Sequence, residues 1–84
     1  MKDKTLTIRI MTSEGMLHEG TASAVFLPGQ IGPFEVLPNH APIISALSAG
    51  PVRMMNGGKE QRIDVGGGVV RVLDNVITVC AEME

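Results

Sequence analysis

The sequence predicts an all-β fold, a flattened sandwich or barrel of about eight to ten short antiparallel strands in a single domain over residues 1–84. Val and Ile together number 16, against 12 for Leu and Ala, and their β-branched side chains favour strands. The 10 glycines and 5 prolines interrupt the chain often, which favours short elements. A chain of this length can bury one modest core, which is mainly aliphatic because Trp and Tyr are absent.

The positions of the first strands follow from alternation and from breakers. Residues 5–11 alternate between apolar and polar side chains, which is typical of a strand half-buried against a core. Gly15 and Gly20 bracket the connection that follows. Residues 22–27 form the second expected strand, and residues 34–37 form a short third one between Gly32-Pro33 and Pro38-Asn39.

The second half of the chain repeats this pattern. Residues 43–47 are apolar but too short for a helix to be assigned. Gly57-Gly58 and Asp74-Asn75 are expected to form hairpin turns. The remaining expected strands are 51–55, 61–65, 69–73 and 76–81.

Charge and composition exclude several classes of partner. The net charge is −2 and the seven basic residues are scattered, so a nucleic-acid partner is not expected. The longest uncharged run, residues 36–52, contains three prolines, and direct insertion into a bilayer is not expected. The start of the chain has no apolar signal core. A single cysteine cannot form an internal disulfide, which favours a reducing compartment.

The residues that could carry catalysis are few. His18 and His40 are the only histidines and Cys80 is the only thiol. Cys80 lies in an apolar strand, so we expect it to behave as a small core residue and not as a nucleophile. These three residues lack metal-ligand spacing. Gly66-Gly67-Gly68 lacks the Lys-Ser/Thr and the helix of a phosphate loop, and it predicts a bulge or a close backbone approach. We therefore expect no catalytic residue, no metal and no cofactor.

One long stretch of the chain is almost uncharged. Residues 20–52 contain a single charged residue, Glu35. A domain this small cannot bury the whole stretch, so part of it must lie at the surface, where a neutral, partly apolar segment is typical of a partner-binding face. A buried crossover segment with ordinary neutral loops is the alternative.

Within this stretch, Pro33, Pro38 and Pro42 fall within ten residues and stiffen the backbone. A stiff loop loses less conformational entropy when it docks. His40, between two of these prolines, either caps the turn through a ring nitrogen or forms a hydrogen bond with a partner.

These residues carry a resemblance to a known family. Residues 32–42 run Gly-x-Phe-x-Val-Leu-Pro-Asn-His-Ala-Pro, which resembles a signature of the epsilon subunit of the F-type ATP synthase, in its N-terminal β-sandwich domain. That signature has Gly or Asn at the position of Asn39. Gly50-x-Val52-Arg53 and residues 65–69 are similar to two further family motifs, and the resemblance extends over essentially the whole chain.

The resemblance implies a mechanical role. The epsilon subunit is a non-catalytic subunit of the rotor, or central stalk, that links the gamma subunit to the membrane ring of c subunits, so that proton-driven rotation is coupled to ATP synthesis. It implies a peripheral location on the cytoplasmic face of the bacterial inner (plasma) membrane, with gamma and the c ring as partners.

The resemblance also implies site residues. The positions that match the gamma-facing side are Thr12, His40 and Ser45, and those that match the c-ring-facing turn are Ile31, Gly32, Pro33, Phe34 and Glu35. The structural motif positions are Pro38, Asn39, His40, Ala41, Pro42, Gly66, Gly67 and Gly68. The family often has an acidic residue at the position of Pro33 and glycine at that of Glu35. We expect Glu35 to take over the acidic role, because positions two apart in a strand point the same way; a solvated rim charge is the alternative.

A second departure concerns the end of the chain. Many family members continue into a C-terminal helical hairpin in which ATP sensing and the braking of hydrolysis reside, whereas this sequence stops at Glu84. A coupling subunit without that brake is therefore expected. Two alternatives stay open: a free-standing small β-sandwich adaptor that binds a protein or peptide at a strand edge, and a minor enzyme that uses His40 or Cys80.

Overall fold

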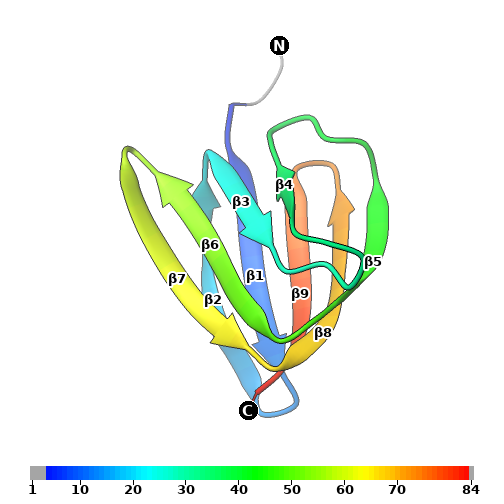
Figure 1. Ribbon diagram of the computed structural model, residues 1–84. Helices are drawn as coiled ribbons and strands as arrows, with labels where there is room; N and C mark the ends of the chain where they lie inside the picture. Colours follow the sequence, from blue (N-terminus) through cyan, green and yellow to red (C-terminus); the bar gives the residue numbers. More distant parts are fainter. Residues whose placement is uncertain (1–3, 84) are drawn as a thin grey trace.

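The computed structural model describes residues 4–83, and in that range it contains nine strands and no helix (Figure 1). In chain order the strands are β1 (Leu6–Thr12), β2 (Gly15–Ala22), β3 (Ala24–Leu27), β4 (Phe34–Val36), β5 (Ile43–Leu47), β6 (Gly50–Asn56), β7 (Lys59–Val65), β8 (Gly67–Leu73) and β9 (Val76–Glu82).

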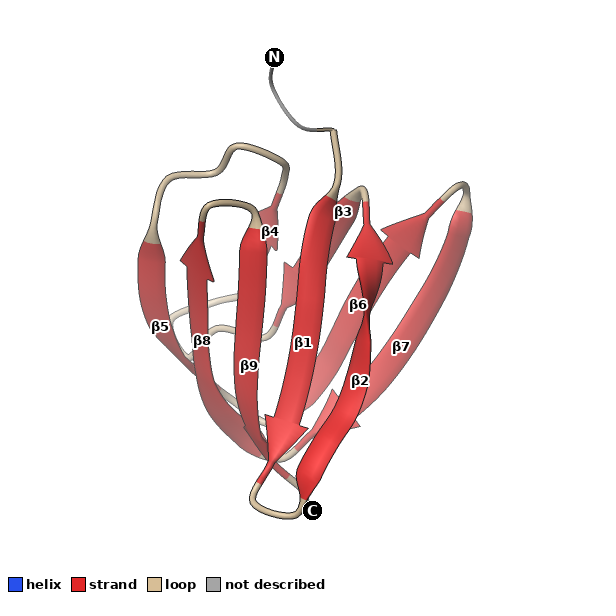
Figure 2. Ribbon diagram, turned by 180° about the vertical axis from the view of Figure 1, so that it is seen from behind, coloured by secondary structure: helices blue, strands red, loops and turns tan. Residues whose placement is uncertain are grey.

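The strands form two sheets that pack face to face (Figures 1 and 2). One sheet has five strands in the order β2-β1-β9-β8-β5, and the other has four in the order β4-β3-β6-β7. The predicted all-β sandwich is thereby confirmed. The expectation of antiparallel strands alone is wrong, because β1 and β9 lie side by side and run parallel.

The core consists of aliphatic side chains from alternate positions of the strands. Within residues 4–83, no polar or charged residue is buried, and no buried side-chain nitrogen or oxygen lacks a hydrogen-bond partner. The two sheets therefore form a dry, rigid platform from which the loops extend. The buried hydrophobic residues are Leu6, Ile8, Ile10, Ala22, Val25, Leu27, Val36, Leu47, Val52, Met54, Val65, Val70, Val72, Ile77, Val79 and Ala81.

The expected strands agree with the observed ones except in two places. Residues 43–47, left without an assignment, form β5. The segment expected to be a connection between Gly15 and Gly20 is part of strand β2. The alternation in β2 is weak because β2 is an edge strand, Ala22 is its only buried residue, and the register with β1 shifts at Met11.

The expectation that Cys80 belongs to the core is wrong. Cys80 is exposed, whereas its neighbours Val79 and Ala81 are buried. Successive side chains of a strand point to opposite faces, so the inward Val79 and Ala81 force Cys80 onto the outer face of the five-stranded sheet. The apolar neighbours in the sequence suggested that Cys80 is buried, but the alternation of side chains along the strand places it on the exposed face.

The glycine run is a place of close backbone approach, as predicted. Gly67 and Gly68 have φ angles of 131° and 140°, which side chains rarely adopt. A Cβ atom at Gly68 would overlap the carbonyl oxygen of Cys80 in β9, and one at Gly67 would lie 3.3 Å from the carbonyl oxygen of Leu47. The run therefore lets β8 pass closely between β9 and β5.

Candidate functional site

The Pro38–Pro42 loop connects β4 in the four-stranded sheet with β5 in the five-stranded sheet (Figure 1). The backbone N–H of His40 donates to the carbonyl of Leu37 at 3.2 Å, which closes the turn. Asn39 has a φ of 68°, in the left-handed region, which Asn and Gly tolerate best. The conformation thus explains why Gly or Asn follows the proline in the signature that this stretch resembles.

His40 is half-buried in this loop. Its Nδ1 lies 2.7 Å from the carbonyl oxygen of Ala41. A carbonyl only accepts, so Nδ1 carries the hydrogen, and in the neutral ring Nε2 is an acceptor. The ring therefore stabilises the turn, as one of the two expectations has it, and keeps an acceptor nitrogen with which it can receive a hydrogen bond from a partner.

The other two residues expected to face gamma lie elsewhere on the five-stranded sheet. Ser45 is half-buried on β5 opposite the buried Val70. Thr12 is half-buried at the end of β1, where its Oγ1 accepts a hydrogen bond from the backbone N–H of Glu14 at 3.1 Å.

The register shows how far apart these residues are. The start of β1 lies beside the β8–β9 hairpin, because the Thr7 N–H donates to the carbonyl of Asn75 at 2.8 Å. The Pro38–Pro42 loop contacts the same hairpin, since the Asn39 N–H donates to Asn75 Oδ1 at 2.6 Å. Thr12 is five residues further along β1, so it lies roughly 17 Å from this end of the sheet. The three residues do not form one compact patch, and a partner that contacts all of them must extend along the sheet.

The turn expected to face the c ring lies between β3 and β4. Its first part is attached to the other sheet, because Gly29 forms a bridge with Leu47 and the Gln30 N–H donates to the carbonyl of Ala46 at 3.1 Å. Ile31 is fully exposed. Gly32 and Pro33 are exposed as well, whereas Phe34 is half-buried and packs against the core. The turn thus projects one large apolar side chain, Ile31, from a well-anchored base.

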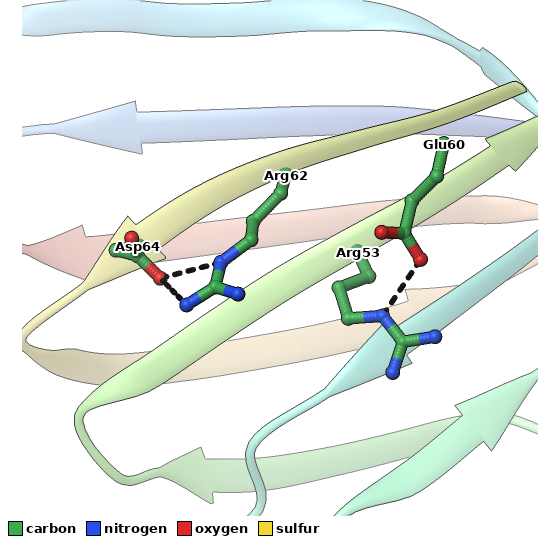
Figure 3. A network of polar contacts seen from close by, with 4 residues as sticks. All are labelled: Arg53, Glu60, Arg62 and Asp64. Atoms are coloured by element: carbon green, nitrogen blue, oxygen red, sulfur yellow. Dashed lines mark hydrogen bonds and ion pairs between the residues drawn. The ribbon is translucent and has the colours of Figure 1, made fainter.

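Glu35 is exposed on the outer face of the four-stranded sheet, and Pro33 is exposed as well. Glu35 lies opposite Phe26, and the guanidinium of Arg53 in the next strand lies 4.6 Å from the centroid of the Phe26 ring. Arg53 also pairs with Glu60 at 2.9 Å, as Figure 3 shows. The carboxylate of Glu35 thus lies at the margin of a face that carries both signs of charge, where a basic group of a partner could reach it.

The outer face of the four-stranded sheet is further charged along its edge strand β7. Arg62 and Asp64 of β7 form an ion pair at 3.0 Å (Figure 3). Charged side chains on an edge strand oppose pairing with another sheet. The edge strand β5 of the other sheet has no charged residue at all.

Sequence reasoning missed two features of the five-stranded sheet. An apolar notch lies at one corner, lined by Pro42, Ile43, Ile44, Arg71, Val72 and Leu73. An apolar row also crosses the outer face, formed by residues in register on all five strands: Met16, Met11, Cys80, Val69 and Ala46. The outward positions of each strand carry this signal in the sequence, but only the register between strands shows that they are neighbours.

The described residues offer little for chemistry. No group of three or more His, Cys, Asp or Glu side chains in residues 4–83 could hold a metal ion. Over the same range, no helix is long and apolar enough to cross a membrane. What the arrangement offers is a set of surfaces on a rigid scaffold.

Comparison with known proteins agrees with this description. The family model described as "ATP synthase, Delta/Epsilon chain, beta-sandwich domain" matches residues 5–83. An ATP synthase epsilon chain of Desulfitobacterium hafniense is 41% identical over 78 residues, which cover 93% of this chain and 59% of that protein. One of Acidithiobacillus ferridurans is 32% identical over 78 residues, covering 93% of this chain and 55% of that protein. The chain thus spans less than two thirds of the length of these relatives.

Solved structures show the same fold. A chain in the structure of the Euglena gracilis mitochondrial ATP synthase, OSCP/F1/c-ring, superposes with a TM-score of 0.87 at 19% identity, over 96% of this chain and 52% of that one. A chain of the Tetrahymena thermophila central stalk/c-ring structure gives 0.75 at 15% identity, over 96% and 65%. The resemblance to the epsilon subunit is confirmed by the family model and by the epsilon-chain relatives. Because the family model extends over residues 5–83, the chain belongs to the family of ATP synthase Delta/Epsilon chain β-sandwich domains.

Proposed function

We propose that this chain is a non-catalytic part of the central stalk of an F-type ATP synthase, where it links the gamma subunit to the c ring and so couples proton-driven rotation to ATP synthesis. Membership of the family supports this role, as do relatives that carry the name ATP synthase epsilon chain. In a bacterial cell the chain would then lie peripherally on the cytoplasmic face of the inner membrane. A mechanical link needs a stiff body with two separate contact regions, and it does not require an active site.

The observation that carries the proposal is the position of two different loops on one rigid sandwich. The loop with His40 precedes β5, and the turn with Ile31 is attached to the last residues of β5 through Ala46 and Leu47. The two loops are therefore separated by the length of β5, roughly 13 Å for four residue steps. His40 and Ile31 can thus contact two different subunits at once.

The proposal is tested by ATP-driven proton pumping in membrane vesicles whose synthase has been depleted of its epsilon subunit. Adding back the purified chain is expected to restore pumping, because only a coupled rotor passes torque from gamma to the ring. ATP hydrolysis that continues without any pumping after the addition would contradict a coupling role.

The gamma contact is tested by titration calorimetry with the cognate gamma subunit. A one-to-one complex with a negative heat-capacity change is expected, as for a buried apolar interface. His40→Ala is expected to weaken binding by about fivefold or more, the cost of an interface side chain worth over about 1 kcal/mol. The matched control is His18→Ala, which removes the second histidine of the sequence, located on β2. Equal affinities for the two variants would remove His40 from the interface.

The ring contact depends on Glu35 in this proposal, facing a basic residue of the c-subunit loop. Glu35→Lys is expected to weaken attachment to the ring by up to about fivefold, since an exposed ion pair contributes at most about 1 kcal/mol. Glu14→Lys, a charge reversal in the exposed β1–β2 turn, is the control. Unchanged attachment in Glu35→Lys would show that Glu35 is a solvated rim charge.

We also propose that the sandwich couples without itself braking ATP hydrolysis. The family's brake resides in a helical hairpin, whereas residues 4–83 are all strand, turn and loop. Adding these 84 residues to depleted enzyme is expected to leave the hydrolysis rate nearly unchanged. A strong fall in that rate would overturn this part of the proposal.

An adaptor that binds a peptide along a strand edge is the second candidate. Strand β5 favours it, because β5 is an uncharged edge strand with an exposed side chain at Ile44. Such binding would add a strand to the sheet. Failure of gamma to bind, with capture of an extended peptide that protects the β5 amides from hydrogen exchange, would favour the adaptor over the stalk subunit.

A further inference from the structure

The side chain of Asn75 holds the Pro38–Pro42 loop against the β8–β9 hairpin. Its Oδ1 accepts a hydrogen bond from the backbone N–H of Asn39 at 2.6 Å. Its Nδ2 donates to Oδ1 of Asn39 at 3.3 Å. These two bonds, which we call the Asn39–Asn75 clasp, join segments 36 residues apart in the sequence.

The same residue also connects the hairpin with the first strand. The backbone carbonyl of Asn75 accepts a hydrogen bond from the N–H of Thr7, in β1, at 2.8 Å. One asparagine therefore ties three parts of the chain at one end of the sandwich, namely β1, the hairpin and the loop with His40.

The hairpin turn alone does not require asparagine at this position. Asp74 and Asn75 have φ angles of 50° and 64°, and a turn with two positive φ angles accepts glycine at either position. Glycine would keep the turn but lose the amide. Aspartate would keep an acceptor for the Asn39 N–H but lose the donor. Asparagine is the residue that supplies the turn, the donor and the acceptor together.

The clasp acts on the residue next to His40. Asn39 is held through its backbone N–H and its side chain, and the following residue, His40, is held through its own N–H to Leu37 and through Nδ1 to Ala41. The position of the imidazole therefore depends on a chain of contacts that starts in another hairpin. Releasing Asn39 would leave the ring to be fixed through the contacts of His40 itself, to Leu37 and Ala41.

We propose that Asn75 is a positioning residue for the gamma interface, which it serves by holding the Pro38–Pro42 loop, and with it His40, in the conformation that docks. This inference rests on the proposed function of that loop. Asn75 itself need not touch gamma. A loop fixed before binding loses less conformational entropy on docking, so the clasp raises affinity without adding a contact.

Three variants test the proposal. Asn75→Gly removes the clasp and keeps the positive φ of the turn. Asn75→Asp keeps the acceptor for the Asn39 N–H and serves as the conservative rescue. Asp74→Gly is the matched control, because it places glycine at the neighbouring turn position, which also has a positive φ. Each variant is examined by thermal unfolding, by hydrogen exchange of the Asn39 amide and by calorimetric titration with gamma.

Asn75→Gly is expected to unfold cooperatively, to lose protection of the Asn39 amide and to bind gamma about fivefold more weakly, the fold-change that corresponds to one net hydrogen bond. Asn75→Asp is expected to recover most of the protection and of the affinity, and Asp74→Gly to retain both. A purely structural role would lower the unfolding temperature of Asn75→Gly but leave its affinity for gamma as in Asp74→Gly.

The outcomes separate two kinds of failure. An Asn39 amide that stays protected in Asn75→Gly would overturn the clasp, whatever gamma does. A freed loop with unchanged gamma affinity, while His40→Ala still weakens binding, would overturn the positioning role alone. Absence of gamma binding by the unaltered chain would overturn the proposed function, and with it the interface that Asn75 is proposed to serve.

Discussion

The two loops on either side of β4 are held in different ways. The Pro38–Pro42 loop is bound by side-chain hydrogen bonds to a distant hairpin. The turn before β4 is held by backbone hydrogen bonds, from Gly29 to Leu27 and from Gly32 to Gly29, both at 3.1 Å. The first loop keeps His40 half-buried, whereas the second exposes Ile31 completely.

This difference indicates two ways of preparing a surface for a partner. A loop stiffened by prolines and by the clasp offers one fixed arrangement of polar groups. A turn with an anchored base and a projecting apolar side chain offers area that a partner can cover. The first suits a tight, oriented contact, and the second suits a contact that relies on burial.

The largest loss of stability is expected from a substitution at the base of the turn before β4. A Cβ atom on Gly29 would lie 2.6 Å from the carbonyl oxygen of Gly32 and 2.9 Å from the Phe34 ring. Gly29→Ala is therefore expected to lower the free energy of unfolding by about 2–3 kcal/mol, as overpacking does. Urea unfolding measures this loss. Gly32→Ala, where nothing lies within 4 Å of the new atom, is the control, and equal losses in the two variants would contradict the explanation.

The next effect concerns the left-handed residue of the Pro38–Pro42 loop. Asn39→Ala is expected to lower the free energy of unfolding by about 1–2 kcal/mol, because the left-handed conformation is unfavourable for a residue that has a Cβ atom but no polar side chain. Asn39→Gly is expected to cost clearly less, since glycine adopts it freely and keeps the N–H that Asn75 accepts. Denaturant midpoints of the two variants give the comparison. A glycine variant as unstable as the alanine variant would show that the side-chain bond, and not the backbone, dominates.

A smaller effect is expected from the prolines themselves. Pro38→Ala gives the unfolded chain more freedom and should lower the unfolding free energy by about 0.4–1 kcal/mol. It should also make the entropy of gamma binding less favourable, which calorimetry measures. Pro33→Ala, in the turn before β4, is the counterpart, and its effect on gamma binding should be absent. The same entropy change for both prolines would remove the distinction between the loops.

The smallest effect on folding is expected at the exposed tip. Ile31→Ser should change the unfolding free energy by less than about 0.5 kcal/mol, because Ile31 is fully exposed. The attachment of the Ile31→Ser variant to the c ring should nevertheless weaken, since apolar area is lost from the proposed contact. Co-sedimentation with ring-containing membranes measures attachment. Full attachment by Ile31→Ser would show that the tip is not buried there.

Much of the fold could be predicted because most strands can be recognised from local sequence patterns. The alternation in β1 and the glycines and prolines between strands gave seven of the nine strands within a few residues. Strand β2 was missed because an edge strand with one buried residue and an irregular register has no clear alternation. The parallel pairing of β1 with β9 was beyond local patterns, since nothing in either strand specifies the direction of its neighbour.

The candidate site could be predicted only in part, for a related reason. The prolines and Asn39 point to a stiff turn, and the structure has one there. The role of Asn75 was not predictable, because a turn explains Asp74-Asn75 completely at the level of sequence. Contacts between segments 36 residues apart emerge only when the sheet is assembled. The interface assignments of Thr12, Ser45 and Glu35 stay predictions, of which the Glu35→Lys experiment above examines one.

The parallel pairing of β1 and β9 has a consequence for how the protein is made. Thr7 pairs with Val76, about 70 positions later. Strand β9 lies between β1 and β8 in the five-stranded sheet, so this sheet cannot close until β9 has left the ribosome. A nascent chain that ends before Val76 would expose the unpaired edges of β1 and β8. We therefore expect the five-stranded sheet to form only after β9 has emerged, and to form slowly because of this long sequence separation, with pulse-labelling of arrested nascent chains showing protection only once β9 is complete.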